Sequence, residues 1–519
     1  MTSHTVSSKK LSLYALKTLS LLCLGAVASL IFPPFINAFW GYSALTFFLC
    51  LLFHKEHTKK HLFYLSYTFG FGFYIAGFSW INNALLIDGE KFIAFVPLVI
   101  MAIGFFFGLF WAIPALFISY GKNIYTKVFF FCSAYTFMEW IRSFIFTGFP
   151  WNLLGTALSF DYRLIQPAAY IGTYGLSLLL ILFCCGLSII LIGLKQKRFY
   201  PASLTLLIIP ILIILLSQQN TTLKGTIEEK QLTIRLVQPS IPQTFKWHPA
   251  LLYKNFRQYI TLTQSKPLDN IDLVVWGETA TPYDLDRDEE HLNELTSAVP
   301  PQGFLATGIL RLGMENGKQT IYNSLYILNH LGEIKDYYDK AHLVPFGEYL
   351  PFREYLPDFM TPVANVVGEL GKGEPKKTIR VSGLPLISGA ICYESIFPKE
   401  TINQNLHSKI LLIVANDGWY GISAGPYQHL AAAQMRAAEE GVTVLRSANT
   451  GISAVIDDKG KILSQIPLNE TAILDTILPK NLSHPTLYGK FGNIIPQILL
   501  ILLLTFTFFL NKKSLSQKK

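Results

Sequence analysis

One cysteine in polar surroundings is the first candidate for chemistry in this chain. Cys392 ends the apolar run 384–391, which predicts a buried strand, and Tyr393, Glu394 and Ser395 follow it directly. A nucleophile at the end of a strand, before a polar loop, stands at the edge of a cleft. A lone buried cysteine is more often a small apolar core residue, so a catalytic role needs other support. The other cysteines lie in or beside apolar runs, which leaves no disulfide framework: Cys23, Cys50, Cys132, Cys184 and Cys185.

Two further segments carry ionisable residues just past predicted strands. Glu278 follows the strand predicted over 271–276, and the segment 336–349 contains Lys340 and Glu348. A thiol has an ordinary pKa of about 8.5, so it needs help to attack an acyl group at neutral pH. Glu278 is the candidate general base and Lys340 the candidate stabiliser of the oxyanion, with Glu348 positioning Lys340 or assisting proton transfer. The alternative is two surface salt bridges and a core cysteine.

The elements that position these residues begin after residue 217, where charged residues become frequent. Strands are predicted over 232–238, 271–276, 304–309, 322–328, 384–391, 410–415, 442–447, 452–457 and 461–466. Helices are predicted over 249–266, 287–298, 396–406 and 426–440. Interleaved strands and helices indicate an α/β domain, here over residues 218–488. Each candidate residue follows a strand, where open α/β sheets place their sites.

The composition indicates that much of the remaining chain lies in a membrane. The chain is 51% hydrophobic and 15% charged, whereas a soluble domain is about one quarter charged. Eight apolar segments are long enough to cross a bilayer: 11–32, 35–53, 62–80, 92–119, 128–146, 168–194, 199–217 and 491–510. We therefore predict a membrane domain of seven helices in residues 1–217. An eighth helix and a cytoplasmic tail are predicted in 489–519.

Basic residues are concentrated in alternate connections between these segments. They are Lys9, Lys10 and Lys17; Lys55, Lys59 and Lys60; Lys122 and Lys127; Lys195, Lys197 and Arg198; and Lys512, Lys513, Lys518 and Lys519. By the positive-inside rule both termini face the cytoplasm and residues 218–490 face outward, into the periplasm of a bacterium with two membranes. The same distribution explains the net charge of +9 better than a nucleic-acid partner does.

Several features outside the triad bear on lipid contact. Glu139 and Arg142, one helical turn apart, are expected to form an ion pair, since charges inside membranes usually pair. The segment 147–152 is expected to be an interfacial anchor or part of a lipid-entry face. The apolar segment 355–367 lacks helical and strand periodicity, which predicts a lid that dips into lipid. Trp247 either lines an acyl cleft or packs within its own loop.

The order Glu278, Lys340, Cys392, each at a strand end, resembles the nitrilase or carbon–nitrogen hydrolase superfamily, whose fold is an α-β-β-α sandwich with a Glu-Lys-Cys triad. The segment Tyr338-Asp-Lys-Ala-His-Leu-Val-Pro-Phe-Gly-Glu-Tyr-Leu-Pro and the segment Ile391-Cys-Tyr-Glu are similar to its membrane branch, the apolipoprotein N-acyltransferases. The segments 237–247, 416–421 and 147–151 share this similarity, and the predicted spans agree with the family's eight. One departure is Gly277 before Glu278, where the family often has proline.

The resemblance implies that a phospholipid acyl chain passes to Cys392 as a thioester. It then passes to the α-amine of the diacylglyceryl cysteine at the N-terminus of an apolipoprotein. The implied partners are thus a phospholipid donor, a diacylated acceptor and membrane lipid, with no nucleic acid, and the chain is expected to be a monomer. No cofactor is implied, and no metal, because His and Cys show no ligand-like spacing. The supporting or substrate-binding residues are Glu348, Tyr393, Glu394 and Trp247.

Two other functions use the same sequence features. A membrane-anchored nitrilase-type amidohydrolase would have the same triad and water as acceptor, although one span would be sufficient for an anchor. A transporter with a non-catalytic sensor domain is disfavoured, because the spans lack paired Gly/Pro breaks and several buried charges. An assay with a lipid acceptor separates these functions.

Overall fold

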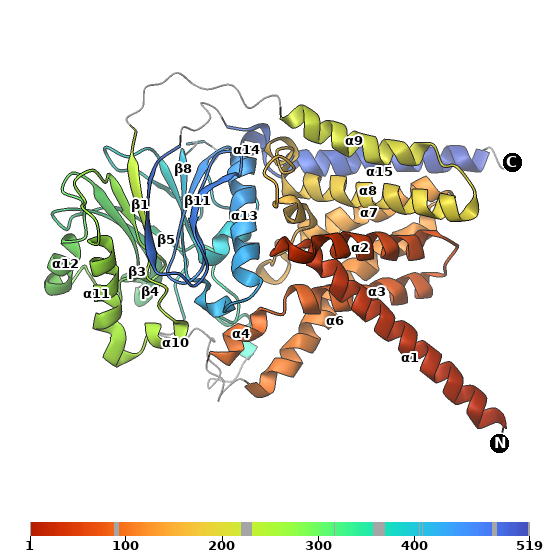
Figure 1. The fold of residues 1–519 in the computed structure, drawn as a ribbon, viewed down its shortest axis with the longest axis horizontal. Coiled ribbons are helices and arrows are strands. Elements are labelled where there is room, and N and C mark those ends of the chain that lie inside the picture. The colour runs from red at the N-terminus through yellow and green to blue at the C-terminus, as the bar shows by residue number, and fades with distance from the viewer. Residues whose placement is uncertain are drawn as a thin grey trace.

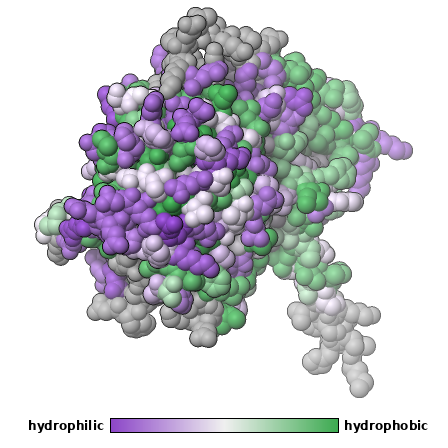
Figure 2. Space-filling view, turned by 60° about the vertical axis from the view of Figure 1, so that its left-hand side comes forward, coloured by the Kyte–Doolittle hydropathy of each residue, from purple (hydrophilic) through white to green (hydrophobic). Residues whose placement is uncertain are grey.

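The computed structural model describes residues 2–87, 93–218, 231–315, 317–355, 369–403, 405–406, 408–479 and 485–516. A bundle of long helices lies beside an α/β domain (Figure 1). Hydrophilic residues cover much of the α/β domain, whereas hydrophobic residues dominate the visible surface of the helical domain (Figure 2). Nearly all of the predicted lid, residues 356–367, lies outside the described residues.

The helical domain is built from the apolar runs of the sequence. Its long helices are α1 (Thr2–Ala28), α2 (Ala38–Phe53), α3 (Lys59–Gly77), α6 (Val96–Leu116), α7 (Ile124–Ile141), α8 (Ala168–Gln196), α9 (Ala202–Ser217) and α15 (Ile494–Ser516). Five stretches are long and apolar enough to cross a membrane: Ser12–Ile31, Phe35–Phe53, Ile93–Tyr120, Ala168–Gln196 and Ile494–Ser514. The other three predicted spans correspond to α3, α7 and α9, which are helical but shorter or less apolar.

The α/β domain contains two six-stranded sheets. The first has the order β12 (Ala472–Ile477), β1 (Thr233–Gln238), β2 (Leu273–Val275), β3 (Phe304–Glu315), β4 (Lys318–Asn329), β5 (Ile334–Asp339). The second has the order β11 (Ile462–Ile466), β10 (Ser453–Ile456), β9 (Thr443–Ala448), β8 (Ile410–Ala415), β7 (Ile387–Ile391), β6 (Thr378–Ile379). In each sheet three neighbouring strands are parallel, β1–β2–β3 and β7–β8–β9, so their carboxyl ends meet at one edge.

The two sheets pack face to face between layers of helices, as the resemblance implied. Leu236 and Val275 of the first sheet meet Ile391 and Leu412 of the second in one buried cluster. Helices α11 (Leu252–Thr263) and α12 (Glu289–Thr296) cover the outer face of the first sheet. Helix α13 (Gly425–Glu440) covers the outer face of the second sheet and lies between that sheet and the helical domain (Figure 1). This arrangement places the second sheet, which carries Cys392, nearer the membrane helices.

Several local predictions about the α/β domain are wrong. The predicted helix 396–406 is absent: residues 392–396 form a 3-10 turn, and the described residues from 397 to 403 form bends and turns. The residue before Pro398 is extended, with φ −86° and ψ 113°, because proline disfavours a helical residue before it. Strands β5, β6 and β12 were not predicted. They lie at sheet edges, where polar side chains weaken the alternation that marks a strand.

The expected ion pair between Glu139 and Arg142 is also wrong. Glu139 Oε1 accepts a hydrogen bond from the backbone N–H of Leu154 at 2.7 Å. Arg142 donates to the carbonyl oxygens of Trp151 at 2.9 Å and of Asn152 at 3.4 Å. Within the described part of the chain no ion pair joins Glu139 to Arg142. The turn at 151–154 has backbone groups without helical partners, and the two buried side chains satisfy them.

Candidate active site

The three predicted catalytic residues meet at the ends of three strands. Glu278 lies just past β2, Lys340 directly follows β5 and Cys392 directly follows β7. Their exposed fractions are 6%, 1% and 5%. The Lys340 Nζ lies 3.5 Å from Glu278 Oε1 and 2.7 Å from Glu348 Oε1, so one ammonium bridges two carboxylates. Low solvent access strengthens these charge interactions.

Asn323 on β4, which sequence reasoning did not identify, completes this cluster. Its Nδ2 donates to Glu278 Oε1 at 2.8 Å and to Glu348 Oε1 at 3.4 Å. The other Glu348 oxygen accepts from the Val344 backbone N–H at 2.8 Å. Burial opposes the charge of Lys340, but Glu348 and Glu278 outweigh it and raise the pKa of the ammonium. Lys340 is therefore a fixed cation at neutral pH, as an oxyanion stabiliser must be.

The backbone at Cys392 is held in an uncommon conformation. Its φ is +53°, in the left-handed region, at the first residue of the 3-10 turn Cys392–Ile396. Strain of this kind persists only where the surroundings impose it, and it is concentrated at functional sites. Burial and the charge of Glu278 raise the pKa of the Cys392 thiol, while Lys340 lowers it. The resting sulfur therefore carries its proton, and attack requires a base beside it.

Glu394 joins the segment that carries Lys340 to the segment that carries Cys392. Its buried carboxylate accepts from the backbone N–H groups of Ile391 at 2.7 Å, Ala341 at 2.8 Å and His342 at 2.9 Å. The Tyr338 hydroxyl donates a fourth hydrogen bond at 2.8 Å. Because these donors flank both Lys340 and Cys392, Glu394 sets the distance between the two segments.

Replacing Glu394 with glutamine is expected to loosen the site without removing a reacting group. The amide nitrogen cannot accept, so at least one buried N–H loses its partner, at a cost of about 1–3 kcal/mol. We expect a thermal midpoint lower by several degrees and weaker acyl transfer. Differential scanning fluorimetry in detergent and a transfer assay measure both. Unchanged values for both would remove Glu394 from the positioning of the site.

Tyr393 and its neighbours connect the site to the helical domain. The Tyr393 hydroxyl donates to the carbonyl oxygen of Gly148 at 2.7 Å, and the His342 Nε2 lies 2.9 Å from the carbonyl oxygen of Thr147. The segment 147–152, predicted as an anchor or lipid-entry face, thus contacts the turn that carries Cys392. Trp247 is half-buried and follows the short helix α10 (Gln243–Lys246).

Lys246, next to Trp247, is a second buried cation that sequence reasoning missed. Its Nζ donates to the backbone carbonyl oxygen of Glu278 at 2.6 Å. Burial lowers its pKa to about 8, against the opposing effects of Glu278 and Cys392. Lys246 therefore holds the loop that presents the Glu278 carboxylate. Its only signal in the sequence is its place in the segment 237–247, which contributed to the family resemblance. On the other side of that loop, a Cβ at Gly277 would lie 2.5 Å from the Asn449 backbone nitrogen.

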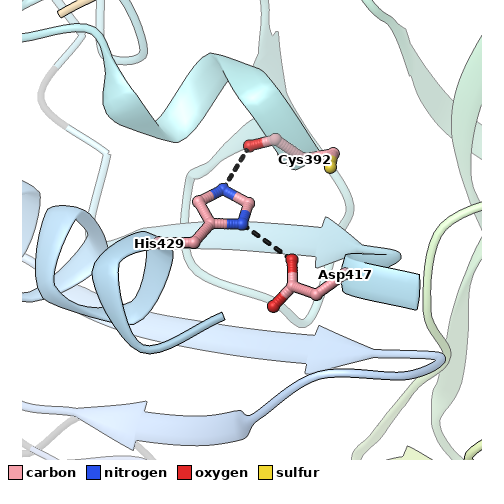
Figure 3. A group of neighbouring side chains, drawn as sticks. All are labelled: Cys392, Asp417 and His429. Carbon is pink, nitrogen blue, oxygen red and sulfur yellow. Dashed lines mark hydrogen bonds and ion pairs between the residues drawn. The ribbon is translucent and has the colours of Figure 1, made fainter. Parts of the chain in front are cut away.

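A buried polar cluster supports the Cys392 turn from below (Figure 3). His429 on α13 lies 2.9 Å from the Cys392 carbonyl oxygen through Nε2, and 2.8 Å from Asp417 Oδ1 through Nδ1. Cys392, Asp417 and His429 are the one group among the described residues whose ligand atoms lie close enough for a metal ion, within 4.8 Å. However, Arg446 Nη2 lies 2.6 Å from Asp417 Oδ2 and 3.1 Å from His429 Nδ1. The Arg446 guanidinium already supplies the positive charge beside Asp417 and His429. These side chains therefore do not fit a metal site.

The fold and the site define the general class of this protein. The family model described as carbon–nitrogen hydrolase matches residues 233–482, which include both sheets and the site. A second model, described as the apolipoprotein N-acyltransferase N-terminal domain, matches residues 24–186 of the helical domain. The α/β domain is therefore a carbon–nitrogen hydrolase domain joined to the membrane domain of one branch.

Curated relatives identify that branch over nearly the whole chain. An apolipoprotein N-acyltransferase of Rickettsia bellii is 34% identical over 511 residues, covering 96% of this chain and 99% of that protein. An apolipoprotein N-acyltransferase of Rhodopseudomonas palustris is 31% identical over 507 residues, covering 94% of each. The chain belongs to the apolipoprotein N-acyltransferase family, as the sequence motifs indicated.

Proposed function

We propose that this enzyme transfers a fatty acyl chain from a phospholipid to the α-amine of the diacylglyceryl cysteine at the N-terminus of a lipoprotein. The observation that supports it best is the contact between an acyl-transfer cluster and the ends of membrane helices. Tyr393 and His342, beside Cys392 and Lys340, bind the carbonyl oxygens of Gly148 and Thr147. A site at this junction suits two substrates with lipid tails, whereas a soluble amide would need no such contact.

The first half-reaction moves the acyl group from the phospholipid to sulfur. Glu278 takes the proton of the Cys392 thiol, and the sulfur attacks the ester carbonyl carbon of the donor. The carbonyl oxygen becomes an oxyanion that Lys340 stabilises. When this intermediate collapses, the bond to the lyso-phospholipid oxygen breaks. Glu278 returns its proton to that leaving oxygen, so Cys392 is left as a thioester and the carboxylate is restored.

The second half-reaction moves the acyl group from sulfur to nitrogen. Glu278 takes a proton from the acceptor ammonium, and the free amine attacks the thioester carbonyl carbon. The new oxyanion again faces Lys340, and its collapse breaks the carbon–sulfur bond. The thiolate takes the second proton of the attacking nitrogen, which yields the amide product and the free Cys392 thiol, and Glu278 releases the proton of the ammonium to water. One cysteine cannot hold the acyl group while the donor still occupies the cleft, so we expect ping-pong kinetics.

We also propose that the chain crosses the membrane eight times as a monomer, with the α/β domain in the periplasm. The eight long helices of the described residues, α1, α2, α3, α6, α7, α8, α9 and α15, match the eight predicted spans. Several basic connections meet at one end of the bundle: Lys127 pairs with Glu56, and the Lys122 backbone N–H donates to Asn511 at 2.9 Å. The α/β domain lies at the other end (Figure 1). This separation agrees with cytoplasmic lysines and a periplasmic site.

Reporter fusions test this orientation. A reporter that is active only outside the cytoplasm is expected to work when fused after Gln218 and to fail after Lys60 or Lys197. The physical reason is the cost of moving clustered lysines across the membrane. The opposite pattern would place the site in the cytoplasm, away from the acceptor proteins, and would overturn the proposed orientation.

Mass spectrometry tests the reaction itself. Purified enzyme incubated with phospholipid and no acceptor is expected to gain one fatty acyl mass on the peptide that contains Cys392. Hydroxylamine should release the adduct, and a diacylated lipopeptide with a free N-terminus should discharge it. The same lipopeptide with an acetylated N-terminus is the matched control and should leave the adduct in place. Triacylated product without any adduct would support direct transfer, and hydrolysis of small amides in place of transfer would support an amidohydrolase.

A further inference from the structure

Tyr420 places a hydroxyl group against the sulfur of Cys392. It ends the 3-10 turn Asp417–Tyr420, which follows β8, the strand beside β7. The Tyr420 Oη lies 3.8 Å from the Cys392 Sγ, within hydrogen-bonding distance for sulfur, and both residues are buried. Neither the triad nor the Glu394 contacts account for this hydroxyl.

The helical domain holds Tyr420 in this position. Its ring meets those of Trp80 and Trp151 edge to face, with centroids 4.6 Å and 5.3 Å away. Both indole N–H groups donate to Oε1 of Gln428 on α13, at 3.1 Å and 2.8 Å. The Asn83 side chain donates to the Tyr420 carbonyl oxygen at 2.6 Å. The rings of Trp80 and Trp151 and the hydrogen bond from Asn83 to the Tyr420 backbone therefore fix where the hydroxyl points.

We propose that Tyr420 is a further catalytic residue, whose hydroxyl donates a hydrogen bond to the Cys392 sulfur whenever that sulfur is negative. Trp80 and Trp151 are the positioning residues that aim it. The inference deepens the proposed function and rests on it, because it requires Cys392 to be the nucleophile.

The sulfur bears negative charge twice in each cycle. It does so after Glu278 has taken the thiol proton, and again when the carbon–sulfur bond breaks in the second half-reaction. A hydrogen bond to a charged acceptor is about twice as strong as one to a neutral acceptor. The hydroxyl therefore stabilises the thiolate more than the thiol or the thioester, and no bond to Tyr420 forms or breaks. Burial and the charges of Cys392 and Asp417 raise the pKa of Tyr420, so the phenol retains its proton.

The Tyr420→Phe variant tests this role, because it removes one oxygen and keeps the ring that packs against the two tryptophans. The readout is the rate at which a small water-soluble iodoacetamide alkylates Cys392, measured against pH and located by peptide mass. We expect the midpoint of this profile to move to higher pH by about one unit, as a charged hydrogen bond predicts. Acyl transfer is expected to fall about tenfold.

Controls separate this effect from a general disturbance of the site. The charged groups that act on the Cys392 thiol, Glu278, Lys340 and Asp417, are unchanged in Tyr420→Phe, and so is Lys246, whose charge interacts with the same thiol. Tyr427→Phe removes a tyrosine hydroxyl at the start of α13, outside the site, and should leave both the midpoint and the transfer rate as in the unmodified enzyme. An unchanged midpoint in Tyr420→Phe would overturn the catalytic role of its hydroxyl.

The positioning role has its own test. Trp151→Phe keeps an aromatic ring but loses the N–H that binds Gln428, so Tyr420 should be aimed less well. We expect the pH midpoint of Cys392 alkylation to shift in the same direction as in Tyr420→Phe, but by less. A lower thermal midpoint with an unchanged alkylation profile would show a merely structural role and would overturn this part of the proposal.

Formation of the acyl adduct on Cys392 distinguishes a failure of the proposed function from a failure of the role proposed for Tyr420. If the unmodified enzyme forms no Cys392 thioester, the proposed function fails, and Tyr420 has no thiolate to stabilise in the reaction. If the thioester forms, and Tyr420→Phe both forms and discharges it at the unmodified rate, only the role of Tyr420 fails.

Discussion

Replacing Cys392 with alanine is expected to lower acyl transfer by about 10³-fold or more, because no other atom can hold the acyl group. The thioester on the corresponding peptide should disappear at the same time. The variant should still fold, because the sulfur makes weak contacts, with the Tyr420 hydroxyl and the Asn416 backbone, and lies at the edge of the core between the sheets. Transfer rate, adduct mass and thermal midpoint are measured on the same preparation.

Cys132→Ala is the matched control, since it also removes a buried thiol, in this case from α7 in the helical domain. It should retain transfer close to that of the unmodified enzyme. A loss below about tenfold in Cys392→Ala, or roughly 1.4 kcal/mol of barrier, would exclude this cysteine as the nucleophile.

Replacing Lys340 with methionine is expected to damage both chemistry and stability. Loss of the cation removes the stabiliser of both oxyanions, which should lower transfer by about 10²–10³-fold. It also leaves the carboxylates of Glu278 and Glu348, now 3.5 Å and 2.7 Å from the ammonium, buried without their counter-charge. Breaking such a buried network costs about 3–5 kcal/mol, so the thermal midpoint should fall markedly.

The double variant Lys340→Met, Glu348→Gln separates these two losses. Removing one carboxylate charge together with the ammonium should restore most of the thermal stability. Transfer should remain as low as in Lys340→Met, because no cation faces the oxyanion. Recovery of transfer in the double variant would show that Lys340 only neutralises the carboxylates and takes no part in stabilising the oxyanion.

Local patterns in the sequence were sufficient to predict the parts of the fold that depend on them. Continuous apolar runs predicted the strands that became β7 and β8, because strands buried on both faces need apolar residues throughout. The same reasoning predicted the apolar helices, five of which are long and apolar enough to cross a membrane, because length and apolarity are local properties. Glu278 and Cys392 were named as candidates because each follows a predicted strand, and the carboxyl ends of parallel strands meet in a cleft. Lys340 follows β5, which was not predicted, and its ionisable segment and the family resemblance named it instead.

Contacts between distant segments could not be predicted in this way. Glu139 was expected to bind Arg142, its neighbour on the helix, but it binds the Leu154 backbone, because a turn brought that orphan N–H within 2.7 Å. The edge strands β5 and β12 depend on hydrogen bonds to neighbouring strands more than on their own weak alternation.

The chemistry of the site also depends partly on local sequence and partly on contacts between distant segments. The sequence was enough to name candidates for the nucleophile, the base and the cation, because these proposed roles depend on residue type and on position in the chain. Only the tertiary structure placed the Glu394 carboxylate among four donors from two segments. It also brought Tyr420 to Cys392, against Trp80 and Trp151 of the helical domain. Such partners lie far apart in the chain, and they meet only when the two sheets, α13 and the membrane helices are packed together.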